Sequence, residues 1–230
     1  MKPTHIDPER DILAVWHDRG NVAAWSRAVR ERRIASRRLV TDAAVVSTVC
    51  TRSPRRVIDL GCGEGWLVRA LAERGIDALG VDAVPALIEV ARAAGGGRYR
   101  VMDYAAVAAG ELRERADVVV CNFSLLGCES VDALLRAIPL LLSPAGVLVI
   151  QTLHPWSACD EAPYRDGWRE GSWTGCGDGF GEAAPWYFRT LAGWQQAFLA
   201  AGLALAAVDE PLHPETGRPV SILFTLQPQA

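Results

Sequence analysis

Three glycines, at positions 61, 63 and 65, follow a buried-type apolar run that spans residues 56–60. Because glycine has no Cβ atom, this glycine loop (residues 61–65) can turn sharply and approach a ligand more closely than other residues allow. A dinucleotide-binding loop would be spaced G-x-G-x-x-G, whereas the spacing here is G-x-G-x-G, with Asp59 two residues before the first glycine. An acid at that place favours an ammonium group over a pyrophosphate.

A second strand-like run, residues 78–82, ends in Asp82. Its carboxylate could accept hydrogen bonds from the two hydroxyls of a ribose. An ammonium group and a ribose on one ligand indicate an amino acid joined to a nucleoside, which is the composition of S-adenosylmethionine.

From Arg56 to Thr152 the chain resembles the class I S-adenosylmethionine-dependent methyltransferases of the small-molecule type. The residues that carry the resemblance are Asp59, the glycine loop, Asp82, Asp103 and the run from Asp117 to Asn122, in the order typical of the family. The resemblance implies an α/β fold with three layers and a doubly wound, mostly parallel sheet of seven strands, the last one antiparallel. A nicotinamide enzyme, or a glycine-rich turn that binds nothing, stays open as an alternative.

The resemblance also implies which residues hold each part of the cofactor. The glycine loop, with Gly61, Gly63 and Gly65, would pass close to the methionine part, and Asp82 would hold the ribose. Asp103 and the backbone of Tyr104 would contact the adenine. Asn122 and Phe123 would flank the methyl donor.

A cluster of arginines precedes the first expected strand, at positions 27, 30, 32, 33, 37 and 38. Basic clusters can indicate contact with nucleic acid. Here Glu31 interrupts the cluster and no aromatic residues interleave for base stacking, so we expect most of these arginines to face solvent. Arg37 is the exception, because a guanidinium at this place could pair with the cofactor carboxylate.

The segment 153–190 is rich in aromatic residues and glycine. We interpret it as a lid insertion that excludes water, with glycines that permit movement. Alternatively, its rings only fasten a small subdomain to the sheet. The candidate substrate-binding residues are Trp156, Tyr164, Tyr187 and Arg189.

His154 follows the fifth expected strand and is the best candidate for a general base, since a neutral imidazole can take a proton from an attacking hydroxyl or amine. Pro155 follows it directly, and the histidine could instead only hold a loop. In-line methyl transfer depends mainly on alignment, so a dedicated base could also be unnecessary.

The segments that must position these residues alternate between strand-like and helix-like patterns, which predicts parallel strands joined by helices. We expect strands near 56–60, 78–82, 99–102, 117–122, 146–152, 203–209 and 220–227, and helices at 65–74, 85–94 and 130–142. Ser130 is a candidate N-cap, and Pro139 should kink or end its helix. Residues 143–146 are predicted to form the turn into the fifth strand.

Length and composition fit one domain, residues 1–230, in which residues 1–50 form a helical cover. A net charge of −3 gives no general attraction to nucleic acid. The longest apolar stretch is too short to span a bilayer, and the six cysteines and four histidines show neither disulfide nor metal-site spacing. We therefore expect a cytoplasmic protein with reduced cysteines and no metal, a monomer or homodimer.

Together these features predict an enzyme that transfers a methyl group from S-adenosylmethionine to a small molecule, with S-adenosylhomocysteine as product. Two other classes stay open: an RNA-modifying methyltransferase that uses the arginine cluster, and a non-catalytic S-adenosylmethionine-binding protein. The sequence does not tell whether oxygen, nitrogen, sulfur or carbon accepts the methyl group.

Overall fold

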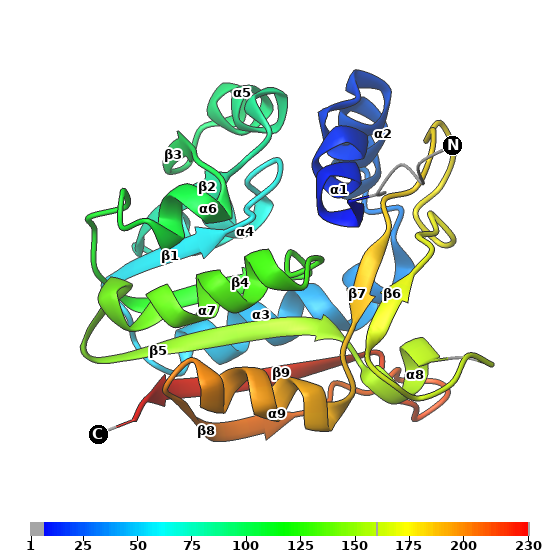
Figure 1. The fold of residues 1–230 in the computed structure, drawn as a ribbon. Coiled ribbons are helices and arrows are strands. Elements are labelled where there is room, and N and C mark those ends of the chain that lie inside the picture. The colour runs from blue at the N-terminus through cyan, green and yellow to red at the C-terminus, as the bar shows by residue number, and fades with distance from the viewer. Residues whose placement is uncertain (1–6, 160, 230) are drawn as a thin grey trace, which may run out of the picture.

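The computed structural model describes residues 7–159 and 161–229, which form a seven-stranded sheet and a separate two-stranded one. The large sheet has the order β3-β2-β1-β4-β5-β9-β8 (Figure 1). Its strands are β1 (Arg56–Leu60), β2 (Asp77–Asp82), β3 (Arg98–Val101), β4 (Ala116–Asn122), β5 (Leu142–Leu153), β8 (Leu203–Asp209) and β9 (Ser221–Pro228). Neighbouring strands are parallel except β9, which is antiparallel to both β5 and β8. The predicted fold class is confirmed.

Helices cover both faces of the large sheet, so the molecule has three layers. Helices α3 (Asp42–Cys50), α4 (Trp66–Ala72) and α5 (Pro85–Ala94) pack on one face, and α6 (Tyr104–Ala108), α7 (Glu129–Leu141) and α9 (Leu191–Ala200) pack on the other. The central strands are buried on both sides. In β1, the consecutive residues Val57 and Ile58 point to opposite faces; they are 1% and 2% exposed and belong to different clusters of the core. Such strands are rich in Val, Ile and Leu because neither face meets water.

Two details of the predicted helix at 130–142 differ in the structure. Ser130 is not the N-cap, because α7 begins at Glu129 after Cys128. A carboxylate from elsewhere takes the capping role: Glu9 accepts hydrogen bonds from the backbone N–H groups of Cys128 (2.6 Å), Glu129 (2.7 Å) and Ser130 (3.2 Å). Pro139 lies inside the helix, which continues to Leu141.

The turn predicted at residues 143–146 is part of strand β5, which begins at Leu142. The register between β4 and β5 shifts here, from Ala116 opposite Leu142 to Val118 opposite Val147. The extra residues bulge out of the ladder, which is how a turn-like sequence is accommodated within a strand.

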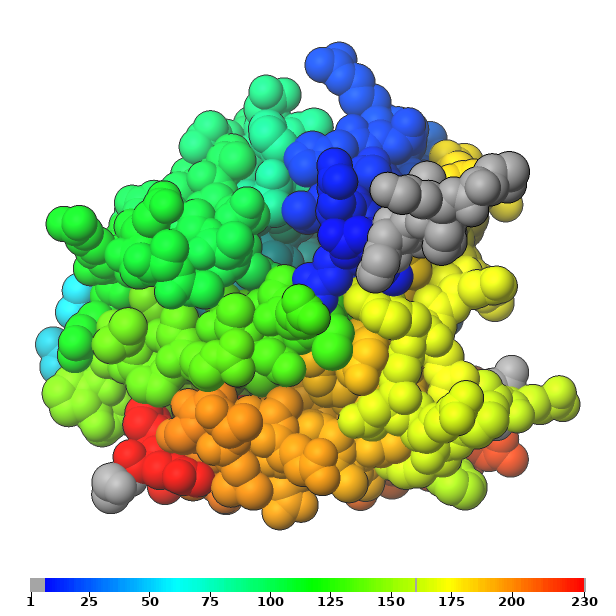
Figure 2. Space-filling view, viewed as in Figure 1, coloured from blue at the N-terminus to red at the C-terminus, as the bar shows by residue number. Residues whose placement is uncertain are grey.

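The N-terminal helices α1 (Pro8–His17) and α2 (Arg19–Arg30) stand beyond the carboxyl ends of the central strands (Figure 1). The π-helical turn η1 (Arg37–Thr41) then leads into α3. In the space-filling view, the N-terminal helices lie between the residues of α4 to α6 and the segment 153–190 (Figure 2). Residues 1–6 of the predicted cover lie outside the described residues.

The segment 153–190 contains the short helix α8 (Pro155–Cys159) and a two-stranded antiparallel sheet, β6 (Gly167–Arg169) with β7 (Trp186–Phe188). Its middle part joins the N-terminal helices through aromatic rings: Trp173 stacks on Phe180 at 4.3 Å and meets Trp16 edge-on at 5.4 Å. None of the helices in the described part of the chain combines the length and the hydropathy that a membrane-spanning segment needs.

Candidate cofactor and active site

The glycine loop has the backbone conformation that its sequence predicts. Gly61, Gly63 and Gly65 have φ angles of 78°, 57° and 84°, in the left-handed region. A Cβ atom on Gly61 would lie 2.3 Å from the Cβ of Ser124. Glycine is therefore required at position 61 both by the backbone conformation and by the close approach of the loop after β4.

Asp82 ends strand β2 and fastens the glycine loop to it. Its carboxylate accepts hydrogen bonds from the backbone N–H groups of Gly63 (2.8 Å) and Val84 (2.9 Å). Burial raises the pKa of Asp82, while these two hydrogen bonds act in the opposite direction. The carboxylate thus lies at the carboxyl edge of the sheet, where ligands of open α/β sheets bind.

Among the carboxyl groups beside the glycine loop, Asp59 has the largest shift in pKa. It is 2% exposed, and its Oδ1 atom has no hydrogen-bond partner among the described residues. Burial, followed by the charge of Asp82, raises the pKa of Asp59 to about 8, against a smaller opposite effect of Arg37. A cationic group placed here would relieve this cost, because an opposite charge favours the ionised carboxylate.

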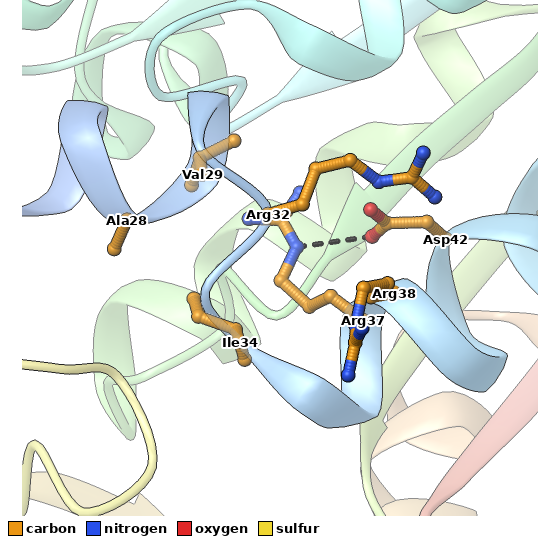
Figure 3. Close-up of a pocket in the computed structure, with 7 residues that line it drawn as sticks. All are labelled: Ala28, Val29, Arg32, Ile34, Arg37, Arg38 and Asp42. Carbon is orange, nitrogen blue, oxygen red and sulfur yellow. Dashed lines mark hydrogen bonds and ion pairs between the residues drawn. The ribbon is translucent and has the colours of Figure 1, made fainter.

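Arg37, from η1, supplies the positive charge that acts to lower the pKa of Asp59. Its Nε atom donates to Asp42 Oδ1 at 3.0 Å, an ion pair drawn in Figure 3, and its guanidinium lies 4.7 Å from the ring centre of Trp66. Its terminal Nη2 is buried without an acceptor among the described residues, as is the hydroxyl of Thr41, one turn further along. The arginine therefore has an unused, desolvated donor.

Four buried polar atoms, on residues of η1 and at the carboxyl ends of β1 and β4, have no hydrogen-bond partner among the described residues. Two are donors, on Arg37 and Thr41, and two are acceptors, Oδ1 of Asp59 and Oδ1 of Asn122. Buried polar groups are rarely left without partners, and exceptions need an explanation. A ligand with one carboxylate and one ammonium group, such as the amino-acid end of a cofactor, carries an acceptor suited to the two donors and a donor suited to the two acceptors.

The other predicted cofactor residues also lie at this edge, in the segments that follow β3 and β4. Asp103 caps α6, with its Oδ1 accepting from the N–H of Ala106 at 2.8 Å. The hydroxyl of Tyr104 is 3.2 Å from the carbonyl oxygen of Ser124. Phe123 has a φ angle of 52°, which is uncommon for a bulky residue, and such outliers cluster at functional sites.

His154 follows β5 and is 5% exposed. Its Nε2 atom lies 2.6 Å from Oε1 of Glu210, and its Nδ1 atom is buried without a partner among the described residues. Among the described residues, the histidine therefore has one paired and one unpaired ring nitrogen, and a general base needs such a nitrogen with an available lone pair.

The four predicted substrate-binding residues have unequal environments. Trp156 is 73% exposed, and the hydroxyl of Tyr164 accepts from the backbone N–H of Leu191 at 3.0 Å. Arg189 is buried and donates to the carbonyl oxygens of residues 127 and 128 and to Asp132 at 2.8–2.9 Å, with its guanidinium over the ring of Tyr187. These contacts give Arg189 a structural role at the start of α7, and they commit its terminal nitrogens to protein acceptors.

Sequence reasoning missed three residues at this site. Glu64, inside the glycine loop, is 1% exposed and pairs with Arg69 and with Arg30 of α2. Thr41 gave no recognisable signal. Glu210 directly follows strand β8, whose last residue is Asp209, so the strand-end signal that identified Asp82 would have pointed to Asp209 and not to Glu210.

Comparison with known proteins agrees with this geometry. Residues 29–208 match the family model described as a methyltransferase domain. Trans-aconitate 2-methyltransferase of Rhodococcus jostii (strain RHA1) is 36% identical over 126 residues, which are 53% of this chain and 47% of that protein. A ubiquinone biosynthesis O-methyltransferase of Bordetella avium (strain 197N) is 35% identical over 104 residues, 44% of this chain and 43% of the relative. The chain therefore spans about half the length of these relatives or less.

Solved structures share the fold across nearly the whole chain. The magnesium protoporphyrin IX methyltransferase of Synechocystis PCC 6803, solved with bound S-adenosylhomocysteine, has a TM-score of 0.68 at 17% identity and covers 97% of this chain and 100% of its own. An S-adenosylmethionine-dependent methyltransferase from Mesorhizobium loti has a TM-score of 0.59 at 24% identity, covering 80% and 95%. At these identities the likeness concerns the fold. The family match includes the glycine loop, Asp59, Asp82 and His154. The chain therefore belongs to the methyltransferase domain family.

Proposed function

We propose that this protein transfers a methyl group from S-adenosylmethionine to a small-molecule acceptor. The observation that carries the proposal is a set of buried atoms without partners among the described residues: donors on Arg37 and Thr41 of η1, and acceptors on Asp59 and Asn122 at the ends of β1 and β4. They match the carboxylate and the ammonium group of the methionine part. A nicotinamide cofactor has no such pair of charged groups.

The remaining cofactor contacts follow from the positions of the loops. Asp82 would bind the ribose, Asp103 and the backbone of Tyr104 would bind the adenine, and Phe123 would lie against the methyl donor. When bound, the cofactor supplies a methyl group activated by a positively charged sulfur. The protein then has to align the acceptor, exclude water and accept a proton where the acceptor carries one.

We also propose that α1, α2 and the segment 153–190 form one cover over the acceptor. Asn21 of α2 is 2% exposed and joins the two parts: it accepts from the N–H of Gly181 at 2.8 Å and donates to the carbonyl oxygen of Glu182 at 3.2 Å. The indole nitrogen of Trp25 would be 3.6 Å from a Cβ on Gly63. The cover therefore reaches the glycine loop, where water exclusion would favour methyl transfer.

The contacts that the arginine cluster makes within the protein favour a small acceptor over RNA. Arg30 donates to Glu64 and to the carbonyl oxygen of Val90, and Arg37 is buried. Arg33 pairs with Glu31. Donors already engaged by the protein contribute less to phosphate binding, which depends on free cationic side chains.

Calorimetry tests the cofactor directly. We expect the protein to bind S-adenosylmethionine and S-adenosylhomocysteine but not NAD, and we expect Asp82→Asn to weaken binding about 100-fold, roughly 2.7 kcal/mol. Asp77→Asn, at the other end of the same strand, is the matched control and should bind normally. Tight binding of NAD without affinity for S-adenosylmethionine would overturn the proposal.

Catalysis is tested separately, by release of S-adenosylhomocysteine over a broad panel of small acceptors. Cofactor binding without turnover of any acceptor would favour a non-catalytic cofactor-binding protein. Salt-sensitive binding of tRNA or rRNA would favour the RNA-modifying alternative.

A further inference from the structure

The pair formed by His154 and Glu210 joins two loops at the carboxyl edge of the sheet. His154 follows β5, and Glu210 follows β8, 56 positions later in the chain. The histidine side chain is 6% exposed and the glutamate side chain is 54% exposed. Glu210 therefore reaches from the surface to a buried imidazole, at a distance of 2.6 Å between Nε2 and Oε1.

This contact decides which nitrogen of the ring carries the proton. A carboxylate accepts hydrogen bonds and has no hydrogen to donate, so Nε2 must be the donor. In the neutral imidazole the other nitrogen, Nδ1, then holds a lone pair. That atom is buried and has no partner among the described residues, so it is free to take a proton from a bound molecule.

We propose that Glu210 is a positioning residue that fixes His154 in this tautomer, and that the methyl acceptor is a neutral group whose proton Nδ1 removes, such as the hydroxyl of an alcohol or phenol. The inference rests on the proposed function. It deepens that function by naming the class of acceptor and a residue that acts through the base.

Atoms and electrons balance in this step. The hydroxyl oxygen forms a bond to the methyl carbon of S-adenosylmethionine while the bond from that carbon to sulfur breaks, and the electron pair of the broken bond stays on the sulfur. The hydroxyl proton moves to Nδ1. The imidazolium so formed is stabilised by the carboxylate of Glu210 and loses its proton to solvent after the product leaves.

The same geometry disfavours an anionic acceptor. A carboxylate attacks without losing a proton, so it gains nothing from a base. It would also lie near the negative charge of Glu210, which repels it. A neutral hydroxyl can approach the buried Nδ1 atom without the cost of desolvating a charge.

The tautomer is measurable without cofactor or acceptor. In nitrogen-15 NMR spectra of the protein at neutral pH, we expect His154 to show a protonated Nε2 and an unprotonated Nδ1. In Glu210→Ala, this signature should be replaced by the averaged signals of exchanging tautomers, and in Glu210→Gln it should be partly retained, because the amide oxygen can still accept. An Nδ1-protonated ring in the wild-type protein would overturn the proposal, whatever the enzyme does.

Kinetics test whether the pair serves the reaction. With phenol and alcohol acceptors, we expect His154→Ala to lower kcat by about 100-fold or more and Glu210→Ala by about 10- to 100-fold, with KM changed less than about two-fold. The double variant should be no slower than His154→Ala alone, because Glu210 acts through the histidine. Glu215→Gln, in the same loop and exposed, is the matched control and should keep wild-type activity.

Three outcomes contradict the inference while leaving the proposed function intact. These are turnover of carboxylates, such as benzoate, in preference to matched phenols; equal loss from Glu210→Ala with and without His154; and a large increase of KM alone. Absence of S-adenosylmethionine binding is the result that would contradict the proposed function itself.

Discussion

Two regions meet at the carboxyl edge of the sheet, and they are held together in different ways. The first, which we call the donor edge because it would hold the methyl donor, is formed by the glycine loop with Asp59 and Asp82. Its contacts join residues that are close in the sequence: Gly63 binds Asp82, 19 positions away, and Glu64 binds Arg69, five positions away. The second is the cover, formed by α1, α2 and the segment 153–190.

The contacts that hold the cover join distant parts of the chain. Glu9 binds the N–H of Cys128, 119 positions away, and Asn21 binds that of Gly181, 160 positions away. The donor edge can therefore form together with two neighbouring strands, whereas the cover requires the whole sheet to be in place. We infer that changes at the donor edge affect global stability and cofactor binding, and that changes in the cover affect local opening and the acceptor.

Gly61→Ala should have the largest effect on stability. The added Cβ would lie 2.3 Å from the Cβ of Ser124, at a φ angle of 78°, so we expect a loss of about 3–5 kcal/mol in the free energy of unfolding, measured in urea. Gly75 has the same φ angle but open space around it. Gly75→Ala should cost only about 1–2 kcal/mol, and equal losses would show that the close approach at position 61 is not tight.

Asp59 should make stability depend on pH. Its pKa rises from an ordinary value of 3.8 to about 8 in the folded protein, mainly because the carboxyl group is buried. Between about pH 4 and pH 8 the folded state therefore binds one more proton than the unfolded state, and the free energy of unfolding falls as the pH rises through this window. Relative to Asp59→Asn, the wild type should lose about 2–4 kcal/mol between pH 5 and pH 8, measured by urea unfolding. Parallel pH curves for the two proteins would refute the pKa shift.

Glu9→Gln should loosen the cover without unfolding the sheet. Its carboxylate caps α7 and holds α1 there, and the lost charge at a helix N-terminus should lower the free energy of local opening of α1 by about 1–2 kcal/mol. Hydrogen exchange of the amides in α1 measures this opening. Asp11→Asn removes an exposed charge from the first turn of α1 without touching α7 and should change the exchange less than Glu9→Gln does. If strand amides exchange faster as well, the cover and the donor edge are not separable.

Trp156→Ala should have the smallest effect on stability. The ring is 73% exposed, so we expect the free energy of unfolding to change by less than about 0.5 kcal/mol. If Trp156 contacts the acceptor, KM for the acceptor should rise while cofactor affinity by calorimetry stays constant. A change in cofactor affinity would place this residue at the donor edge instead.

Much of the fold could be predicted from local pattern. Each expected strand lies close to an observed one. For the central strands the reason is that strands buried on both faces need continuous Val, Ile and Leu, which is visible in the sequence; the edge strands β3 and β8 are mostly exposed or half-buried. One error, the turn expected at residues 143–146, arose because a bulge absorbs these residues into β5, and another arose where a distant residue overrode the local signal. Ser130 looks like a helix cap, but Glu9 supplies the capping carboxylate from another helix.

The same division applies to the site. The roles of Asp59 and Asp82 rest on their positions relative to strands and to the glycine loop, which the sequence displays. Arg189 was proposed for substrate binding because of its charge and its place after an aromatic segment, yet in the structure its nitrogens are bound to carbonyl oxygens and to Asp132. The contact of Glu210 with His154 can be recognised only in the tertiary structure, where β8 pairs with β9 and the end of β8 lies at His154.

The sequence by itself determined the donor edge, because glycine spacing, strand pattern and acids at strand ends are all local properties. The tertiary structure decided the rest of the site: which donors and acceptors are buried without partners, which arginines are already engaged, and which carboxylate orients the histidine. Those properties depend on burial and on contacts between residues 56 to 160 positions apart, and no local pattern contains them.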